Sequence, residues 1–370
     1  MSNFVLPDTL KPRDGRFGCG PSKIRPEAVA SLAQQATSLL GTSHRQSRVR
    51  DEVGRLGDGI RSLFALPDGY EVLFTLGGAT AFWDAAAYGL VEQRSRHYVF
   101  GEFSGKFATV TKRAPWLDEP DVIHAPVGDV PAIQAAEACD VQAITHNETS
   151  TGAMLNPARI DDALVVVDAT SGAGGLPVNI ADTDVYYFSL QKGFASEGGL
   201  TVAILSPRAI DRIGRITQSG RYIPEFFNLS VALDNSRKNQ TYNTLSISTV
   251  FLAAEQVDWQ LNTFGSLDGV VAAQREKAAV LYDWAERSPY ATPFVHNPAH
   301  RSLVVGTVDL DDTVNADTVN AVLRENGILD TDPYRKLGRN QLRVGMFPAV
   351  DTADVQAYTA CVDAVVEAIS

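Results

Sequence analysis

Short apolar segments alternate with longer amphipathic segments through the first 205 residues of the chain. Seven apolar runs have the length of a strand, at 71–76, 97–100, 122–124, 141–146, 164–168, 185–190 and 200–205. Helical patterns lie between several of them, at 79–91, 104–112 and 130–138. Because strands rich in β-branched residues that alternate with helices are typical of a sheet covered on both faces, the pattern predicts an α/β domain with a mainly parallel, seven-stranded sheet.

The regions on either side of this alternation show other patterns. Residues 1–19 have the pattern of an irregular arm, and 222–245 is polar and rich in loops. Further helical patterns occupy 26–40, 47–66, 207–216, 247–262 and 267–286. The last two are separated by a break near Gly265, which is a candidate hinge.

The last part of the chain has the pattern of a smaller unit. Strand-like runs occur at 302–308 and 342–344, and helical patterns at 316–325 and 353–369. An α+β unit of about 100 residues is a plausible small domain. We therefore expect an arm and a large domain over 1–262, and a small C-terminal domain over 263–370.

Bulk composition excludes several classes of protein. The chain has 370 residues, of which 45% are hydrophobic and 21% charged, as in ordinary globular proteins. Its formal net charge of -12 disfavours binding to nucleic acid or to an anionic membrane. No apolar run approaches the roughly 20 residues of a transmembrane helix, and the first residues do not resemble a signal peptide. Three widely spaced cysteines indicate neither a disulfide framework nor a metal site, so a cytoplasmic location is expected.

A lysine stands at the end of one predicted strand. Lys192 follows the apolar run 185–190 and begins a glycine-rich turn before the next run. A desolvated lysine loses part of its preference for charge, and its amine can then form a Schiff base with a carbonyl compound. A lysine that simply leaves the sheet for solvent explains the same pattern, and this segment alone leaves both interpretations open.

Polar or glycine-rich residues follow other strands of the predicted sheet, where ligands of open α/β sheets bind. Gly77-Gly78-Ala79-Thr80 joins a strand to a helix, and a helix N-terminus can hold a phosphate, although a plain tight turn fits as well. Residues 146–152 are short and polar, and either bind a ligand or cap a turn. Asp168 ends an apolar strand, where burial of a carboxylate is costly unless a cation or hydrogen bonds compensate its charge. It could also simply cap the following turn. Phe103 either faces a ligand ring or belongs to the core.

Together, Asp168 and Lys192 suggest a cofactor that is held at two points. Lys192 would bind an aldehyde carbon, and Asp168 would keep a ring nitrogen protonated. Basic residues that could bind an acidic substrate lie elsewhere, at His44, Arg45, Arg335, Lys336, Arg339 and Arg343. Among them Arg343 stands beside a predicted strand, where a guanidinium can bind a carboxylate through two hydrogen bonds.

Several short motifs, in this order along the chain, resemble those of the phosphoserine aminotransferases. These enzymes are pyridoxal-phosphate-dependent aminotransferases of class V, and the similarity spans nearly the whole chain. The motifs are Gly18-Cys19-Gly20-Pro21, Gly41-Thr42-Ser43-His44-Arg45, Asn147-Glu148-Thr149, Asp168, Ser189-Leu190-Gln191-Lys192-Gly193, Tyr242-Asn243-Thr244 and Arg343-Val344-Gly345. The resemblance implies the fold type I of pyridoxal-phosphate enzymes, with a large sheet domain between helices and a small C-terminal α+β domain.

The resemblance also implies a role for individual residues. Lys192 would be the Schiff-base lysine and proton carrier, and Asp168 would pair with the pyridine nitrogen. Other cofactor contacts would come from Ala79, Thr80, Phe103, Thr149 and Gln191. Asn243 and Thr244 would reach the cofactor phosphate from the second subunit of a homodimer with shared active sites. His44 and Arg45 would meet the acidic groups of the substrate across the same interface, and Arg343 would hold its α-carboxylate. Arg335 and Lys336 would also bind the substrate, and no metal is expected.

The chain departs from the family pattern at two places. The residue that stacks on the cofactor ring is commonly tryptophan, and the matching position here is Phe103. The usual His-Arg pair before Arg343 has no clean equivalent, and Tyr334-Arg335-Lys336 is the nearest segment. The substrate phosphate would therefore be bound by a different set of residues, such as Arg335 and Lys336.

The resulting hypothesis is a phosphoserine transaminase of L-serine biosynthesis. It would move the amino group of L-glutamate to 3-phosphohydroxypyruvate, and a role in pyridoxine biosynthesis through phosphohydroxythreonine stays open. One alternative is a serine–glyoxylate or alanine–glyoxylate aminotransferase, and a second is a non-catalytic ligand-binding protein with the same fold. A cysteine desulfurase needs a cysteine in a mobile loop. It is disfavoured because Cys361 falls inside the last helical pattern and Cys139 at the end of another.

Overall fold

The larger sheet of the molecule has seven strands. The computed structural model describes residues 4–369, so residues 1–3 of the expected arm and residue 370 lie outside the described part. The strand order is β1-β9-β8-β7-β4-β2-β3. β9 runs antiparallel to both neighbours, and the other adjacent strands are parallel. The bounds are β1 (Glu71–Leu76), β2 (Ser95–Val99), β3 (Asp121–His124), β4 (Val141–Thr145), β7 (Leu164–Asp168), β8 (Val185–Ser189) and β9 (Leu200–Leu205). The prediction of a mainly parallel, seven-stranded sheet is confirmed.

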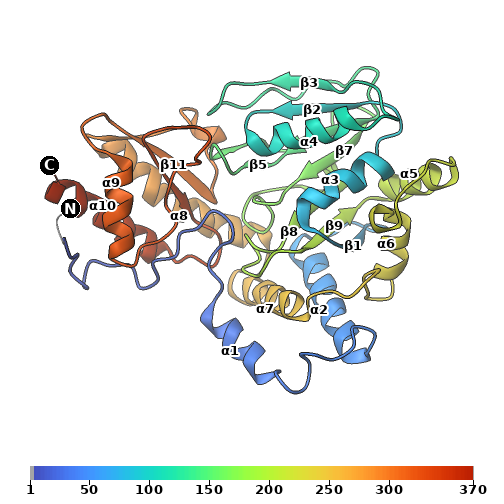
Figure 1. Ribbon diagram of the computed structural model, residues 1–370, viewed down its shortest axis with the longest axis horizontal. Helices are drawn as coiled ribbons and strands as arrows, with labels where there is room; N and C mark the ends of the chain where they lie inside the picture. The colour runs from blue at the N-terminus through green and yellow to red at the C-terminus, as the bar shows by residue number, and fades with distance from the viewer. Residues whose placement is uncertain (1–3, 370) are drawn as a thin grey trace.

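Helices cover both faces of this sheet (Figure 1). Alternate residues of a strand point to opposite faces, so Val165 and Val167 of β7 pack in one core and Leu164 and Val166 in the other. The first core includes α2 (Ser47–Leu63) and α7 (Ile247–Phe264). The second includes α3 (Gly78–Gly89), α4 (Glu102–Arg113), α5 (Pro207–Gln218) and α6 (Leu229–Ser236).

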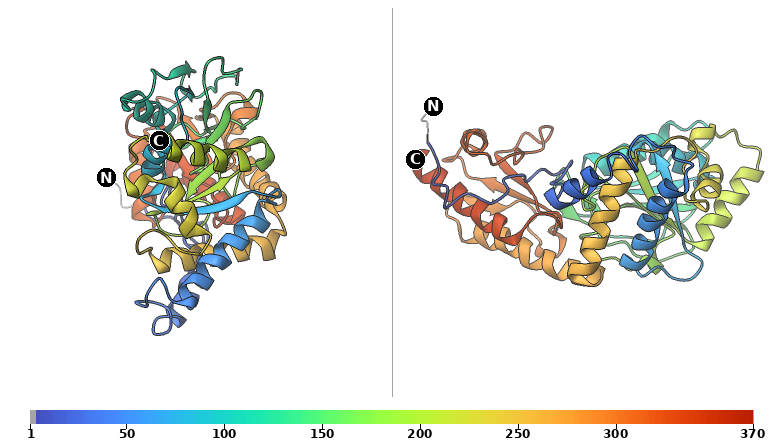
Figure 2. Two further views of the ribbon diagram at one scale, coloured as in Figure 1. Left: turned by 90° about the vertical axis from the view of Figure 1, so that its right-hand side faces the viewer. Right: turned by 90° about the horizontal axis from the view of Figure 1, so that it is seen from below.

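A smaller antiparallel sheet lies toward the C-terminus, in the order β10-β11-β12. Its strands are β10 (Ala291–Pro293), β11 (Val305–Leu310) and β12 (Gln341–Gly345). The helices of the same region are α8 (Leu267–Arg287), α9 (Ala316–Glu325) and α10 (Thr352–Ile369). Gly265, between α7 and α8, has a φ of 78°, a conformation that favours glycine. The small C-terminal domain is thus present beside the large sheet, as Figure 2 shows, and a boundary at 262 and 263 stays a prediction.

The N-terminal arm joins the two parts before α1 (Pro26–Gln34) begins. It follows the small domain, where Leu6 N donates to Asn326 Oδ1 and Gly345 N donates to Phe17 O. It then reaches the large domain, where Ser22 N donates to Gln191 O at 2.8 Å. The arm therefore carries residues 18–21 into the space between the two domains.

Some expected elements differ from those observed. The expected helix over 130–138 is absent, because side chains bind its backbone groups: Tyr98 donates to Gln134 O, and Ala136 N donates to Asp161. The first helix ends at Gln34 rather than at residue 40, and α6 and β10 were not predicted. Short elements are β5 (Asn147–Glu148), β6 (Ala153–Met154) and the 3-10 helices Ile180–Asp182, Glu225–Phe227 and Pro298–His300. None of the helices within 4–369 is both long and apolar enough to cross a membrane.

Candidate active site

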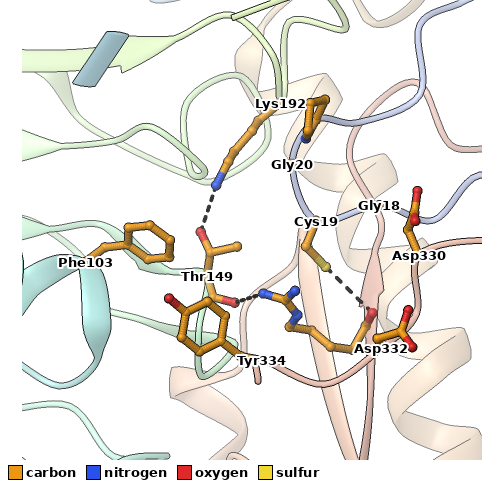
Figure 3. A pocket seen from close by; sticks show the side chains of 11 residues that line it. Gly18, Cys19, Gly20, Phe103, Thr149, Lys192, Asp330, Asp332 and Tyr334 are labelled. Carbon is orange, nitrogen blue, oxygen red and sulfur yellow. Dashed lines mark hydrogen bonds between the residues drawn. The ribbon is translucent and has the colours of Figure 1, made fainter. Parts of the chain in front are cut away.

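Lys192 lies on the turn after β8, and its side chain is buried. Its Nζ donates to Thr149 Oγ1 at 3.0 Å, as Figure 3 shows. The backbone on either side is fixed by the arm, since Ser22 Oγ donates to Lys192 O at 2.7 Å. Gly20 leaves space for the lysine stem, because a Cβ there would lie 2.5 Å from Lys192 Cε. The lysine is therefore held in one direction, toward Thr149.

Burial changes the chemistry of this amine. It lowers the pKa of Lys192 from 10.5 to about 8, against the opposing charges of Asp168 and Glu148. The ion pairs among residues 4–369 do not include Lys192. An amine of this kind is uncharged in a substantial fraction of molecules near neutral pH, and can act as a nucleophile or as a base.

Asp168 ends β7 and is only 5% exposed. Its carboxylate accepts hydrogen bonds from Trp83 Nε1 at 2.9 Å and from Thr170 N at 3.0 Å. No cation within the described residues pairs with it. Because a buried carboxylate is costly without a positive partner, this group is suited to a ligand that carries a protonated ring nitrogen.

Both groups line a cavity of about 320 Å³. One end is formed by the N-terminus of α3, after Gly77 and Gly78, which have φ values of 101° and 69°. Ala79 and Thr80 line this end, and Ala79 N donates to Ser189 Oγ at 2.8 Å. A helix N-terminus favours an anionic group such as a phosphate. The cavity also includes Phe103, Asn147, Thr149, Thr170, Ser171 and Gln191.

The polar atoms of this cavity fit pyridoxal phosphate. Thr170 Oγ1 and Gln191 Oε1 are buried and have no hydrogen-bond partner among residues 4–369. These two atoms are available to bind substituents of a ring. Lys192 and Asp168, which have no ion-pair partner, are available for an aldehyde and for a ring nitrogen. The phenyl ring of Phe103 has its centroid 5.5 Å from Lys192 Nζ, so a flat ring could stack on it.

A second cavity, of about 370 Å³, adjoins the first and shares Phe103, Thr149 and Lys192 with it. Arg343 of β12 lines it and donates from Nη1 to Thr149 O at 3.2 Å. Its Nε is buried and has no partner among the described residues. Tyr334 lies 5.4 Å from the guanidinium. The second cavity therefore presents a guanidinium near the amine of Lys192.

Two of the predicted substrate residues lie away from this cavity. Arg335 does not line this cavity but an adjoining hollow, which shares Asp332 and Tyr334 with it. Lys336 is exposed and forms an ion pair with Glu102 at the start of α4. The structure thus brings Lys336, but not Arg335, to an element that also carries Phe103.

The residues expected to act across a subunit interface lie together, and none of them lines either cavity of this chain. His44 and Thr244 are joined by a hydrogen bond of 3.3 Å, and Arg45 donates to Gln240 Oε1 at 3.2 Å. Asn243 and Thr244 are exposed. These two segments form one surface region, which we call the 44–244 surface (residues 44, 45, 240, 243 and 244).

Several residues of the two cavities were given no role by the sequence reasoning. Trp83 binds Asp168, and Ser189 binds Ala79 N. Cys19, Tyr334, Asp330 and Asp332 line the second cavity. Trp83 stands one helical turn after Ala79 and Thr80, so the helix periodicity would have placed it on the same face. In the part of the chain that the structure describes, no three His, Cys, Asp or Glu residues form a group that could hold a metal ion.

Comparison with known proteins agrees with this geometry. The aminotransferase class-V family matches residues 127–331. Phosphoserine aminotransferase of Corynebacterium glutamicum (strain R) is 55% identical over 371 residues, with 99% of this chain and 98% of that protein covered. A phosphoserine aminotransferase structure from Cytophaga hutchinsonii has a TM-score of 0.86 at 25% identity, covering 95% of this chain and 99% of that one.

The same fold occurs in a pyridoxal-phosphate-bound phosphoserine aminotransferase from Trichomonas vaginalis. Its TM-score is 0.83 at 19% identity, and 95% of this chain and 100% of that one are covered. The predicted fold class and cofactor are therefore confirmed. On the strength of the sequence identity over nearly its whole length, the chain belongs to the phosphoserine aminotransferase family of class-V, pyridoxal-phosphate-dependent aminotransferases.

Proposed function

We propose that this enzyme moves the amino group of L-glutamate to 3-phosphohydroxypyruvate, which yields O-phospho-L-serine and 2-oxoglutarate for L-serine biosynthesis. The observation that carries the proposal is that two buried charged groups without ion-pair partners, Lys192 and Asp168, line one cavity. Family membership supports the choice of reaction and substrates.

Lys192 would carry the proton in this reaction. When bound, pyridoxal phosphate supplies an electron sink for the negative charge that develops at the substrate α-carbon. Lys192 Nζ, as an uncharged amine, takes the proton from that carbon and later returns one. The lowered pKa, about 8, keeps part of the amine uncharged for this purpose. Thr149 Oγ1 accepts a hydrogen bond from Nζ and so orients it.

Asp168 and the N-terminus of α3 would hold the two ends of the cofactor. The Asp168 carboxylate would pair with the protonated ring nitrogen, while Trp83 and Thr170 fix its orientation. Ala79 and Thr80 would bind the cofactor phosphate at the helix N-terminus. Gln191, which has an unpartnered Oε1, would add a further polar contact.

Arg343 and Lys336 would bind the two acidic ends of the substrate. Arg343 lines the second cavity and has a free, buried Nε, which suits a bidentate contact with the α-carboxylate. Lys336, in the loop before β12, pairs with Glu102 at the start of α4 and could exchange Glu102 for the substrate phosphate. Arg335, expected at the same place from the sequence, is less suited because it lines another hollow.

A homodimer with shared active sites would explain the 44–244 surface. His44, Arg45, Asn243 and Thr244 are gathered on that surface, away from the cavities of their own chain. In a dimer they could reach the cofactor and substrate of the other subunit. We also propose a cytoplasmic location, which the three free cysteines support. Measurement of the molecular mass in solution tests the dimer, and an active monomer would contradict it.

A substrate panel on the cofactor-loaded protein tests the proposed reaction. Turnover of glutamate with 3-phosphohydroxypyruvate should exceed turnover of alanine or serine with glyoxylate by at least about a hundredfold in kcat/KM, because a site that binds a phosphate discriminates strongly against substrates without one. Preference for glyoxylate would favour the related aminotransferases instead. A protein without visible cofactor absorbance after loading would be a non-catalytic member of the fold.

A further inference from the structure

A second buried carboxylate lies next to the site, and the proposed chemistry does not use it. Glu148 of β5 has no exposed surface. Its Oε2 accepts hydrogen bonds from Phe103 N at 3.1 Å, Ser104 N at 3.0 Å and Ser104 Oγ at 2.9 Å, and its Oε1 accepts one from Ser150 Oγ at 2.7 Å. The backbone N–H partners can only donate, so Glu148 acts as an acceptor toward the start of α4.

These hydrogen bonds hold the first turn of α4, which begins at Glu102. The first N–H groups of a helix have no partner within the helix, and the helix dipole favours a negative charge there. Phe103 is the second residue of this helix, so Glu148 binds the backbone of the residue whose ring borders both cavities. The position of that ring depends on where the helix begins.

The contact between Glu148 and the start of α4 is very close. A Cβ on Gly101 would lie 2.3 Å from Glu148 Cγ and 2.4 Å from its Cδ. The φ of Gly101 is 176°, an extended conformation that any residue can adopt. The absence of a side chain at this position is therefore a matter of space, and it allows the carboxylate to reach the helix N-terminus.

Glu148 also precedes Thr149, which contacts both reactive sides of the site. Thr149 Oγ1 accepts from Lys192 Nζ at 3.0 Å, and Thr149 O accepts from Arg343 Nη1 at 3.2 Å. The anchored side chain of Glu148 thus fixes the backbone from which Thr149 extends. One carboxylate thus connects Phe103, the stacking residue, with Thr149, which contacts both Lys192 and Arg343.

We propose that Glu148 is a positioning residue of the cofactor site, which fixes Phe103 and Thr149 in the arrangement that binds the pyridine ring. The inference rests on the proposed cofactor role of the cavity. It predicts that a change at Glu148 alters the affinity and the orientation of the cofactor, beyond any effect on folding.

The test compares Glu148→Gln with a matched control, Asp140→Asn. Asp140 is also a carboxylate that binds backbone N–H groups, those of Glu92, Gln93 and Arg94, each at 2.8 Å, and it lines neither cavity. Each protein is stripped of cofactor and titrated with pyridoxal phosphate. The measurements are the dissociation constant, the circular dichroism of the visible cofactor band and the unfolding temperature of the stripped protein.

Glu148→Gln should weaken cofactor binding about tenfold or more. The NH₂ group of the glutamine is a hydrogen-bond donor, and on one side of the contact it would face other donors instead of an acceptor. It should also reduce the visible circular dichroism, which reports the orientation of the bound ring. Asp140→Asn should lower the unfolding temperature and leave both cofactor signals at the parental values. If Glu148→Gln lost only stability, as the control does, the carboxylate would be a structural cap and the inference would be wrong.

A second variant covers the case in which Glu148→Gln does not fold. Gly101→Ala keeps the carboxylate but displaces it from α4, and should change the same two cofactor signals in the same direction. Parental signals in Gly101→Ala would overturn the inference. Neither measurement needs an amino donor, so the result stands even if the substrate panel fails. A parent protein that binds no pyridoxal phosphate would overturn the proposed function and this inference together.

Discussion

The two cavities that meet at Lys192 differ in how their charged side chains are balanced. In the cavity lined by Lys192 and Asp168, both of these charged groups are buried, and neither has an oppositely charged partner among residues 4–369. Apart from Lys192, the charged groups that line the second cavity are more exposed. Asp332 pairs with Arg324, whereas Arg343 and Asp330 take part in no ion pair among residues 4–369. Outside this cavity, Lys336 pairs with Glu102.

This difference indicates two ways of preparing a ligand site. Buried charges without partners raise the free energy of the empty site, so the first cavity is poised for a ligand that carries the complementary groups. Exposed ion pairs contribute little to stability and exchange readily with solvent or ligand. We therefore expect substitutions in the first cavity to have large effects on the chemistry, and substitutions at the paired residues to have small effects on binding.

The largest effect is expected for Lys192→Ala. The cofactor-loaded variant should lose the visible absorbance of the parent, and kcat should fall by at least about a thousandfold, because both the nucleophile and the proton carrier are removed. Absorption spectra and steady-state kinetics measure the two effects. If the visible absorbance survived, Lys192 would be the wrong lysine.

Lys277→Met is the matched control for this experiment. Lys277 is also buried, and burial lowers its pKa to about 7, but it donates to Gln274 Oε1 at 2.6 Å and to Phe347 O at 3.1 Å, and it lines neither cavity. The variant should keep the visible absorbance even if its stability falls. A loss of absorbance in both variants would show that burial, and not position, explains the effect at Lys192.

The first cavity was the more predictable of the two from the sequence. Asp168 ends β7, and Lys192 and Thr149 lie a few residues after β8 and β4 of the large sheet. The ends of parallel strands meet at one edge of a sheet. Hydrophobic runs of strand length therefore placed these residues together before any coordinates were considered. The same reasoning overlooked Trp83, although helix periodicity places it on the face of Ala79 and Thr80. It also overlooked Ser189, because its hydrogen bond to Ala79 N has no periodic signal in the sequence.

The second cavity depends on contacts that sequence patterns do not specify. Residues 18–21 of the arm and residues 330–334 of the small domain meet there from opposite ends of the chain. Arg335 and Lys336 are adjacent in sequence, yet one lines an adjoining hollow and the other pairs with Glu102. Only the path of the loop before β12 separates them, and loop paths follow from tertiary packing rather than from local propensity.

An intermediate effect is expected for Arg343→Gln. The KM values for glutamate and for 3-phosphohydroxypyruvate should both rise about tenfold to a hundredfold, because a charge-assisted contact with the α-carboxylate that both substrates carry is lost. The dissociation constant of pyridoxal phosphate should stay near the parental value, since Arg343 lines only the second cavity. Unchanged KM values would remove Arg343 from substrate binding, and a large loss of cofactor would show that the two cavities are not separate in function.

The smallest effect concerns the ion pair of Glu102 with Lys336. Glu102 also pairs with Lys106 at 3.3 Å. Because Lys336 is exposed, its contact with Glu102 can exchange readily with solvent or with a ligand. The pair connects α4 of the large domain with the loop before β12, so it has two possible roles. It either keeps Lys336 near the position of the substrate phosphate until that phosphate replaces Glu102, or it only links the two domains.

The two roles can be distinguished by the direction in which Glu102→Gln and Lys336→Gln change the KM for 3-phosphohydroxypyruvate. If the phosphate replaces Glu102, Glu102→Gln should lower the KM for 3-phosphohydroxypyruvate a few-fold, by removing the competing carboxylate, and Lys336→Gln should raise it by a similar factor. If the pair is only a link, both variants lose the same contact and should change KM in the same direction. The effects should shrink as salt is added, because exposed charges are screened. Opposite signs at low salt would identify Lys336 as a phosphate ligand in place of the missing His-Arg pair, and equal signs would leave that position to residues of the 44–244 surface.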